Sequence, residues 1–177
     1  MSRLTRQKAQ RVPARPAGGR RDVWRKRGGL AAHRKKFGIV VSRFNEFITK
    51  RLLDSALESL LQYGAASKFI ETIWVPGALE IPFFAKRLTL RKRFDALIVL
   101  GCILRGDTIH FELVSNEVIR GVSQVALETG VPIASGIITA DDLGQAIDRA
   151  GLKLGNKGAQ AAAAAVEIAN LNQALNS

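Results

Sequence analysis

The stretch Ala96-Leu-Ile-Val-Leu-Gly-Cys-Ile-Leu104 is the longest apolar run in the chain, and the rest of the sequence is best interpreted outward from it. A run of this length is too short to span a membrane, but it suits a strand that is covered on both faces of a parallel sheet. It leads into the polar stretch Arg105-Gly-Asp-Thr108 and then into a helical pattern. A buried strand followed by a short loop and a helix is the repeating unit of α/β folds.

Shorter apolar or β-branched runs on either side repeat this unit. Strands are expected over residues 37–41, 69–75, 95–104 and 131–138. Helices are expected over residues 48–64, 78–88, 111–130, 141–150 and 156–175. Repeated strand–helix units with right-handed crossovers predict a four-stranded parallel sheet with helices on both faces. We therefore expect a three-layer, flavodoxin-like α/β sandwich.

Helix periodicity indicates which faces are buried. In the first helix one apolar residue recurs at every fourth position: Ile48, Leu52, Ala56 and Leu60. The last helix has a comparable set at Ala164, Ile168, Leu171 and Leu175. Its alanine run, residues 161–165, favours helix and permits close approach of a neighbour, so we expect it to offer a packing surface in an assembly.

Positive charge is concentrated at one end of the chain. Of 27 Lys and Arg residues, 13 lie in residues 1–36 with one acid, whereas residues 37–177 hold 14 cations and 14 acids. We interpret residues 1–36 as a disordered basic tail and residues 37–177 as one domain. The tail is either simply solvated or bound to an anionic partner such as RNA, and the neutral remainder should not contribute to that binding. No apolar segment follows the basic start, so a cytoplasmic location is expected.

The small number of cysteines and histidines excludes several site types. A single cysteine, Cys102, rules out a disulfide scaffold or a multi-cysteine zinc site, and its apolar setting favours a small buried hydrophobe over a nucleophile. The phosphate, zinc-hydrolase and serine-hydrolase motifs GxxxxGK[ST], GxGxxG, HExxH and GxSxG are all absent. A nucleoside triphosphate site, a zinc hydrolase and a serine hydrolase therefore each lack the residues that their chemistry needs.

Ligands of parallel α/β sheets gather outside the carboxyl ends of the strands, so the strand–helix junctions are the candidate site. After the central strand, the helix start offers free N–H groups to an anion, Gly106 permits close approach, and Thr108 can cap the helix or contact a phosphate. His110, the only histidine beyond residue 36, lies within a turn of that position and can exchange protons near neutral pH. Glu80 follows a Pro-Gly break at another strand end and is either part of the site or a surface acid.

Two further junctions allow simpler interpretations. Phe44 is a core or a site aromatic, and Asn45 suits a helix cap. Asp141 and Asp142 open the fourth junction, where their charges suit the positive end of the helix expected over residues 141–150.

These junctions carry a family resemblance. Over roughly residues 37–172 the chain resembles the lumazine synthases, and six segments match in order. They are Arg43-Phe-Asn45, Val75-Pro-Gly-Ala-Leu-Glu-Ile-Pro82, Leu100-Gly-Cys-Ile-Leu-Arg-Gly-Asp-Thr-Ile-His-Phe-Glu112, Ser115-Asn-Glu117, Ala146-Ile-Asp-Arg-Ala-Gly151 and Gly155-Asn-Lys-Gly158. The resemblance implies condensation of 5-amino-6-(D-ribitylamino)uracil with 3,4-dihydroxy-2-butanone 4-phosphate to 6,7-dimethyl-8-ribityllumazine, with release of phosphate and water. It implies neither a metal nor a redox cofactor.

The resemblance also implies a role for each matching residue. Phe44 would stack on the pyrimidine, and His110 would shuttle protons. The ribityl chain would lie against Ala78, Leu79 and Glu80, and the pyrimidine would lie against Cys102, Ile103 and Leu104. The butanone phosphate would be held by Gly106, Asp107 and Thr108, with Arg149 arriving from the adjacent subunit. Active sites between subunits imply a homo-oligomer, a pentamer or an assembly of pentamers.

One position departs from the family pattern. Ser135 stands where the family commonly has a phenylalanine, so stacking on the pyrimidine from the neighbouring subunit would be weaker. An alternative is therefore a non-catalytic flavin-binding or shell-forming paralogue whose tail binds nucleic acid.

Overall fold

A computed structural model of the chain describes residues 27–153 and 155–176. Four parallel strands form one sheet in the order β2-β1-β3-β4. Their bounds are β1 Phe37–Ser42, β2 Ile70–Val75, β3 Ala96–Leu104 and β4 Ile133–Ala140. The predicted four-stranded parallel sheet is confirmed.

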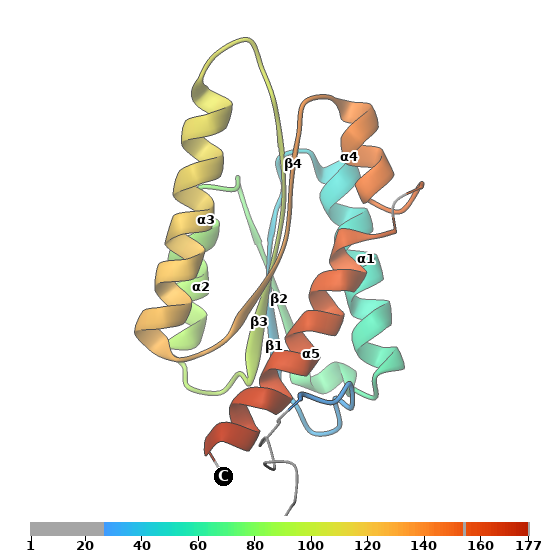
Figure 1. Ribbon diagram of the computed structural model, residues 1–177, viewed down its shortest axis with the longest axis vertical. Helices are drawn as coiled ribbons and strands as arrows, with labels where there is room; N and C mark the ends of the chain where they lie inside the picture. The colour runs from blue at the N-terminus through green and yellow to red at the C-terminus, as the bar shows by residue number, and fades with distance from the viewer. Residues whose placement is uncertain (1–26, 154, 177) are drawn as a thin grey trace, which may run out of the picture.

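Helices cover both faces of the sheet. They are α1 Glu46–Gln62, α2 Ile81–Thr89, α3 His110–Thr129, α4 Leu143–Arg149 and α5 Lys157–Asn176, with a short 3-10 helix η1 at Ser67–Phe69. One face carries α2 and α3 and the other carries α1, α4 and α5, which confirms the three-layer α/β sandwich (Figure 1). No helix among the described residues is both long and apolar enough to cross a membrane.

Strand β3 is buried from Ala96 to Ile103 because both of its faces are covered. Alternate residues pack against opposite helix layers: Leu97 and Val99 join the core beneath α2 and α3, whereas Ile98 and Leu100 join the core beneath α1 and α5. The register pairs Ser42 with Val75 on β2, and it brings the carboxyl ends of all the strands to one edge of the sheet. The loops that follow β1, β2 and β3 therefore meet there.

Helix α5 buries a different face from the one expected. Its buried residues are Gly158, Ala161, Ala162, Ala165, Val166 and Ala169, whereas Leu175 is 62% exposed. A Cβ atom on Gly158 would lie 1.9 Å from the carbonyl oxygen of Leu52 on α1, so the two helix backbones approach very closely. Small side chains therefore permit this close contact between α5 and α1. Most of the alanine run packs inside the protomer instead of offering an outer surface.

Folded structure also begins earlier than expected. Residues 28–36, which we call the N-terminal strap, lie across the ends of α1 and α5 (Figure 1). Ala32 is fully buried, and its N–H donates to the carbonyl of Tyr63 at 2.8 Å. The side chain of Asn170 donates to the carbonyls of Gly29 and Ala31 at 2.7 and 3.0 Å. The strap is therefore part of the folded structure and not of the tail, contrary to the expected boundary at residue 36. The sequence did not indicate this because hydrogen bonds to main-chain groups hold the strap, and such bonds leave no apolar pattern. The remainder of the expected tail, residues 1–26, lies outside the described residues.

Candidate active site

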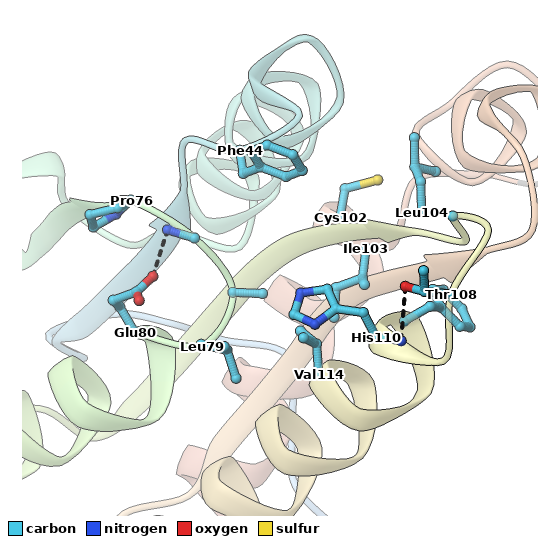
Figure 2. A pocket seen from close by; sticks show the side chains of 14 residues that line it. Phe44, Pro76, Leu79, Glu80, Cys102, Ile103, Leu104, Thr108, His110 and Val114 are labelled. Atoms are coloured by element: carbon cyan, nitrogen blue, oxygen red, sulfur yellow. Dashed lines mark hydrogen bonds between the residues drawn. The ribbon is translucent and has the colours of Figure 1, made fainter.

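A cavity of about 500 Å³ opens at the edge of the sheet where the strands end (Figure 2). Its walls come from the loops after β1, β2 and β3 and from the first turns of α3. The lining residues are Phe44, Pro76, Gly77, Ala78, Leu79, Glu80, Cys102, Ile103, Leu104, Gly106, Thr108, His110, Phe111 and Val114.

Most of the expected site residues meet in this cavity. Three do not line it: Asp107 is exposed in the loop, Ser135 lies on β4, and Arg149 ends α4. The Oγ of Ser135 accepts from the N–H of Ile137 at 3.4 Å, and Arg149 donates to the carbonyl of Gln145 at 3.2 Å. The roles implied for these three residues remain predictions.

Sequence reasoning missed some of the lining. Phe111 and Val114 belong to the apolar stripe of α3, and the sequence alone did not assign them to the site. These two residues lie in the first turns of the helix and line the cavity. The later residues of the same stripe, Val118, Val122 and Val125, are buried in the core. Pro76 and Gly77 were noticed only as a strand break.

Asn45 fixes the position of Phe44 by an unexpected contact. The residue adopts the left-handed conformation, with φ 60° and ψ 44°, and its side chain makes no capping hydrogen bond. Instead its Nδ2 donates to the carbonyl of Cys102 on β3 at 2.9 Å. The N–H of Phe44 donates to the carbonyl of Pro76 at 3.0 Å, so this turn is tied to both neighbouring strand ends. The 71% exposed Phe44 ring is thereby held at the cavity.

Glu80 shapes the opposite wall of the cavity. Its Oε2 accepts from the N–H of Gly77 at 2.7 Å, which closes the Pro76–Gly77 turn (Figure 2). The side chain is half-buried and lines the cavity, unlike the free surface acid that the sequence also allowed. A carboxylate held in this way can accept hydrogen bonds from ligand hydroxyls through its other lone pairs.

His110 opens α3 and reaches across the cavity. Its ring extends from the helix start toward the segment that carries Leu79 (Figure 2). The Oγ1 of Thr108 accepts from the N–H of His110 at 3.4 Å, a long bond, and Ile109 at the cap position has no side-chain hydrogen bond to offer. The N–H of Glu112 already donates to the carbonyl of Ile109 at 3.1 Å, so the N–H groups of His110 and Phe111 are the ones that the start of α3 can offer to an anion at the cavity. A Cβ atom on Gly106 would meet nothing within 4 Å, so ligand atoms have room beside that residue.

Cys102 is not a nucleophile. Its side chain is 2% exposed, and burial raises the pKa of the thiol from 9.0 to about 11. The thiol therefore stays protonated near neutral pH, and its side chain points away from His110 (Figure 2). Cys102 contributes to the cavity wall as the small buried hydrophobe that the sequence suggested.

Arg105 braces the loop between β3 and α3. Its Nε donates to Asp141 at 2.7 Å, its Nη1 donates to Glu112 at 3.3 Å, and its guanidinium carbon lies 4.5 Å from the centre of the Phe111 ring. These hydrogen bonds raise the pKa of Arg105 and hold the pKa of Asp141 below its ordinary value. The loop after β3 is thereby tied to the loop after β4.

The junction between β4 and α4 differs from the expectation in one respect. Asp141 was assigned to the start of a helix, but α4 begins at Leu143. Asp142 is its cap, and its Oδ1 accepts from the N–H of Gln145 at 2.8 Å. Asp141 is left free to serve the brace. Within the described parts of the chain, no three His, Cys, Asp or Glu side chains gather in a way that could hold a metal ion.

The fold and the cavity define a class: a three-layer α/β protein with a ligand site at the carboxyl edge of its parallel sheet. The family model described as 6,7-dimethyl-8-ribityllumazine synthase matches residues 34–173. The 6,7-dimethyl-8-ribityllumazine synthase of Desulfotalea psychrophila (strain LSv54 / DSM 12343) is 52% identical over 148 residues, which is 84% of this chain and 96% of that relative. The chain therefore belongs to the 6,7-dimethyl-8-ribityllumazine synthase family.

Proposed function

We propose that this protein is a transferase of riboflavin biosynthesis. It condenses 5-amino-6-(D-ribitylamino)uracil with 3,4-dihydroxy-2-butanone 4-phosphate, forms 6,7-dimethyl-8-ribityllumazine, and releases phosphate and water. The observation that carries the proposal is the meeting of Phe44, Glu80 and His110 around one cavity of about 500 Å³. These residues come from three separate segments of the chain that match the family.

The cavity offers a distinct surface to each part of the substrates. Phe44 presents an exposed ring for the flat pyrimidine, and main-chain groups of residues 102–104 meet the edge of that ring system. Glu80 accepts from hydroxyls of the ribityl chain. The start of α3, with Gly106 and Thr108, receives the phosphate.

The phosphate needs a charge that this protomer does not supply. Among the described residues that line the cavity, none is Lys or Arg, and Glu80 is negative. A helix start alone provides only about half a positive charge. Arg149 of an adjacent subunit would complete the site, because its guanidinium can make paired hydrogen bonds to a phosphate.

The chemical steps make modest demands on the protein. The 5-amino group of the uracil attacks the ketone to give an imine with loss of water. Loss of a proton from the adjacent carbon then expels phosphate and leaves an enol, which becomes a ketone. The ribityl-substituted amine attacks this ketone and loses a second water, which closes the new ring. His110 accepts and returns protons during these steps, a contribution of about 10²–10⁴-fold in typical enzymes. Holding two reactive substrates in one cavity supplies much of the remaining acceleration.

A shared site requires an oligomer, and we propose at least a cyclic pentamer. The outer faces of α2 and α3 support this, because they expose large apolar side chains. Phe83 is 63% exposed, Leu113 57%, Ile119 44% and Leu127 86%. Such a surface suits burial against another subunit. A cytoplasmic location also belongs to the proposal.

The test is product formation by the purified protein. Mixed with both substrates, it should form the fluorescent lumazine far above the rate in buffer, and neither substrate alone should give product. The His110→Ala variant serves as the matched control for a folded but impaired site. Binding of lumazine without any formation of it would instead support a non-catalytic flavin-binding relative.

A further inference from the structure

Negative charge gathers around the loop that would receive the substrate phosphate. The segment from the end of β3 to the first turn of α3 carries Asp107 and Glu112, and Asp141 directly follows β4. All three acids are exposed. Arg105 is the only Lys or Arg between residues 94 and 119 of the sequence. On this protomer, a phosphate that approaches the start of α3 therefore meets more carboxylates than cations.

Arg105 is shared between two of these acids. Its Nε lies 2.7 Å from Oδ1 of Asp141, and its Nη1 lies 3.3 Å from Oε1 of Glu112. Its guanidinium carbon lies 4.5 Å from the centre of the Phe111 ring, which is part of the cavity wall. Since these three contacts occupy both edges and one face of the guanidinium group, Arg105 has little left to offer to a further anion.

Glu112 is the acid that can interfere most directly with a bound phosphate. It lies in the first turn of α3, where the positive end of the helix attracts negative charge. A glutamate at the third position of a helix can also reach back to the main-chain N–H groups at the helix start. A phosphate at that helix start would therefore compete with the Glu112 carboxylate for the same attraction.

The two acids do not depend equally on Arg105. Within the described part of the chain, Arg105 is the only cation at ion-pair distance from Glu112. Asp141 is also influenced by a second cation: the hydrogen bond from Arg105 lowers its pKa most, and the charge of Arg149 lowers it further. Loss of Arg105 would therefore leave Glu112 less well neutralised than Asp141.

We propose that Arg105 is a positioning residue for the butanone phosphate: it holds the Glu112 and Asp141 carboxylates away from the start of α3 and keeps that helix start open to the phosphate. The inference rests on the proposed function. Without Arg105, the carboxylate of Glu112 is free to turn toward the helix start and to repel the phosphate. Exposed ion pairs contribute little to folding, so the effect falls on phosphate affinity and not on stability.

The experiment measures lumazine formation with each substrate varied in turn. The test variant is Arg105→Gln, which removes the charge and keeps a polar side chain. It is combined in separate proteins with Glu112→Gln and with Asp141→Asn. The control is Arg91→Gln, which removes a cation paired with Glu71 on the segment that precedes β3, at the opposite end of the sheet. Urea unfolding of every variant reports on the fold.

We expect Arg105→Gln to raise the Michaelis constant for the butanone phosphate about fivefold, because two exposed carboxylates lose their shared cation. The constant for the uncharged uracil should change less than about twofold, and the midpoint of urea unfolding should stay the same. Adding Glu112→Gln should restore the phosphate constant almost to the wild-type value, whereas adding Asp141→Asn should restore less of it. Raising the salt from about 50 to 200 mM should shrink the defect, because exposed charges are screened. Arg91→Gln should match the wild type.

Three results would overturn the inference. A raised constant that Glu112→Gln does not lower would mean that Arg105 contacts the phosphate itself. An unchanged constant in Arg105→Gln would mean that the two acids do not affect the phosphate. Equal increases for both substrates, together with a lower urea midpoint, would make Arg105 a purely structural residue. Failure of the proposed function is distinct from all three, since the wild-type protein would then form no lumazine.

Discussion

Asn45 offers the sharpest test of how the local structure builds the cavity. Replacement by alanine removes the hydrogen bond to the Cys102 carbonyl and leaves the left-handed conformation to a residue that adopts it less readily than asparagine does. A net hydrogen bond contributes about 0.5–1.5 kcal/mol, and the left-handed conformation costs an ordinary residue about 1–2 kcal/mol. Asn45→Ala should therefore lower the free energy of unfolding by about 2–3 kcal/mol. Asn45→Gly keeps the backbone conformation accessible and should cost only about 1 kcal/mol.

The comparison needs urea unfolding at one fixed protein concentration, because subunit association adds to apparent stability. Product formation should be followed in parallel. Both variants loosen the turn that carries Phe44, so the Michaelis constant for the uracil should rise several-fold, and more than that for the butanone phosphate. Equal destabilisation by Ala and Gly would refute the role of the backbone conformation. Wild-type stability in both variants would refute the contribution of the hydrogen bond.

Four other predictions concern separate parts of the molecule. His110→Ala should lower turnover by roughly tenfold to a hundredfold with little loss of stability, as measured by lumazine formation and urea unfolding. Arg149→Lys should raise the Michaelis constant for the butanone phosphate well above that for the uracil, because lysine lacks the fork that suits phosphate. Gly158→Ala should destabilise the fold by about 3 kcal/mol or more, since its Cβ atom would lie 1.9 Å from the Leu52 carbonyl oxygen. Because the pKa of Cys102 is raised from 9.0 to about 11, its stabilising contribution is complete below pH 9 and should be lost as the pH rises toward 11 in unfolding titrations.

Each of these predictions has a result that would contradict it. A large stability loss with unchanged turnover would make His110 a structural residue. Equal effects of Arg149→Lys on both substrates would argue against contact with the phosphate. A Gly158→Ala protein of wild-type stability would mean that α1 and α5 can separate freely. A folded protein whose stability does not change between pH 9 and 11 would contradict the burial of the Cys102 thiol.

The fold was largely predictable because its strongest signals are local. The run at residues 96–104 is buried on both faces, and the four-residue spacing in α1 matches the buried residues Ile48, Leu52, Ala56 and Leu60. The buried face of helix α5 was less predictable because it is set by the close approach of its backbone to that of α1. Gly158 and the alanines permit this approach, but their spacing alone does not show which neighbour they contact. The strap was missed because its anchors are main-chain groups, which carry no apolar pattern.

The candidate site was predictable where one short segment carries both the geometry and the chemistry. His110 and Glu80 each lie where the loop after a strand meets the next helix, so the position of the cavity followed from the order of strands and helices. The contact from Asn45 to the Cys102 carbonyl and the brace made by Arg105 join segments 57 and 36 residues apart. No local pattern encodes such contacts. The role proposed for Arg149 requires a second subunit and is beyond what one protomer can display.

The most direct test of the central claim is to measure lumazine and inorganic phosphate in the same reaction. The wild-type protein should release the two products in equal amounts at a rate proportional to protein concentration, and His110→Ala should slow both equally. Phosphate release without lumazine would contradict the account, because the cavity would then be hydrolysing the butanone phosphate instead of condensing it. Lumazine formation at the buffer rate, in a protein that is folded and assembled, would contradict it as well.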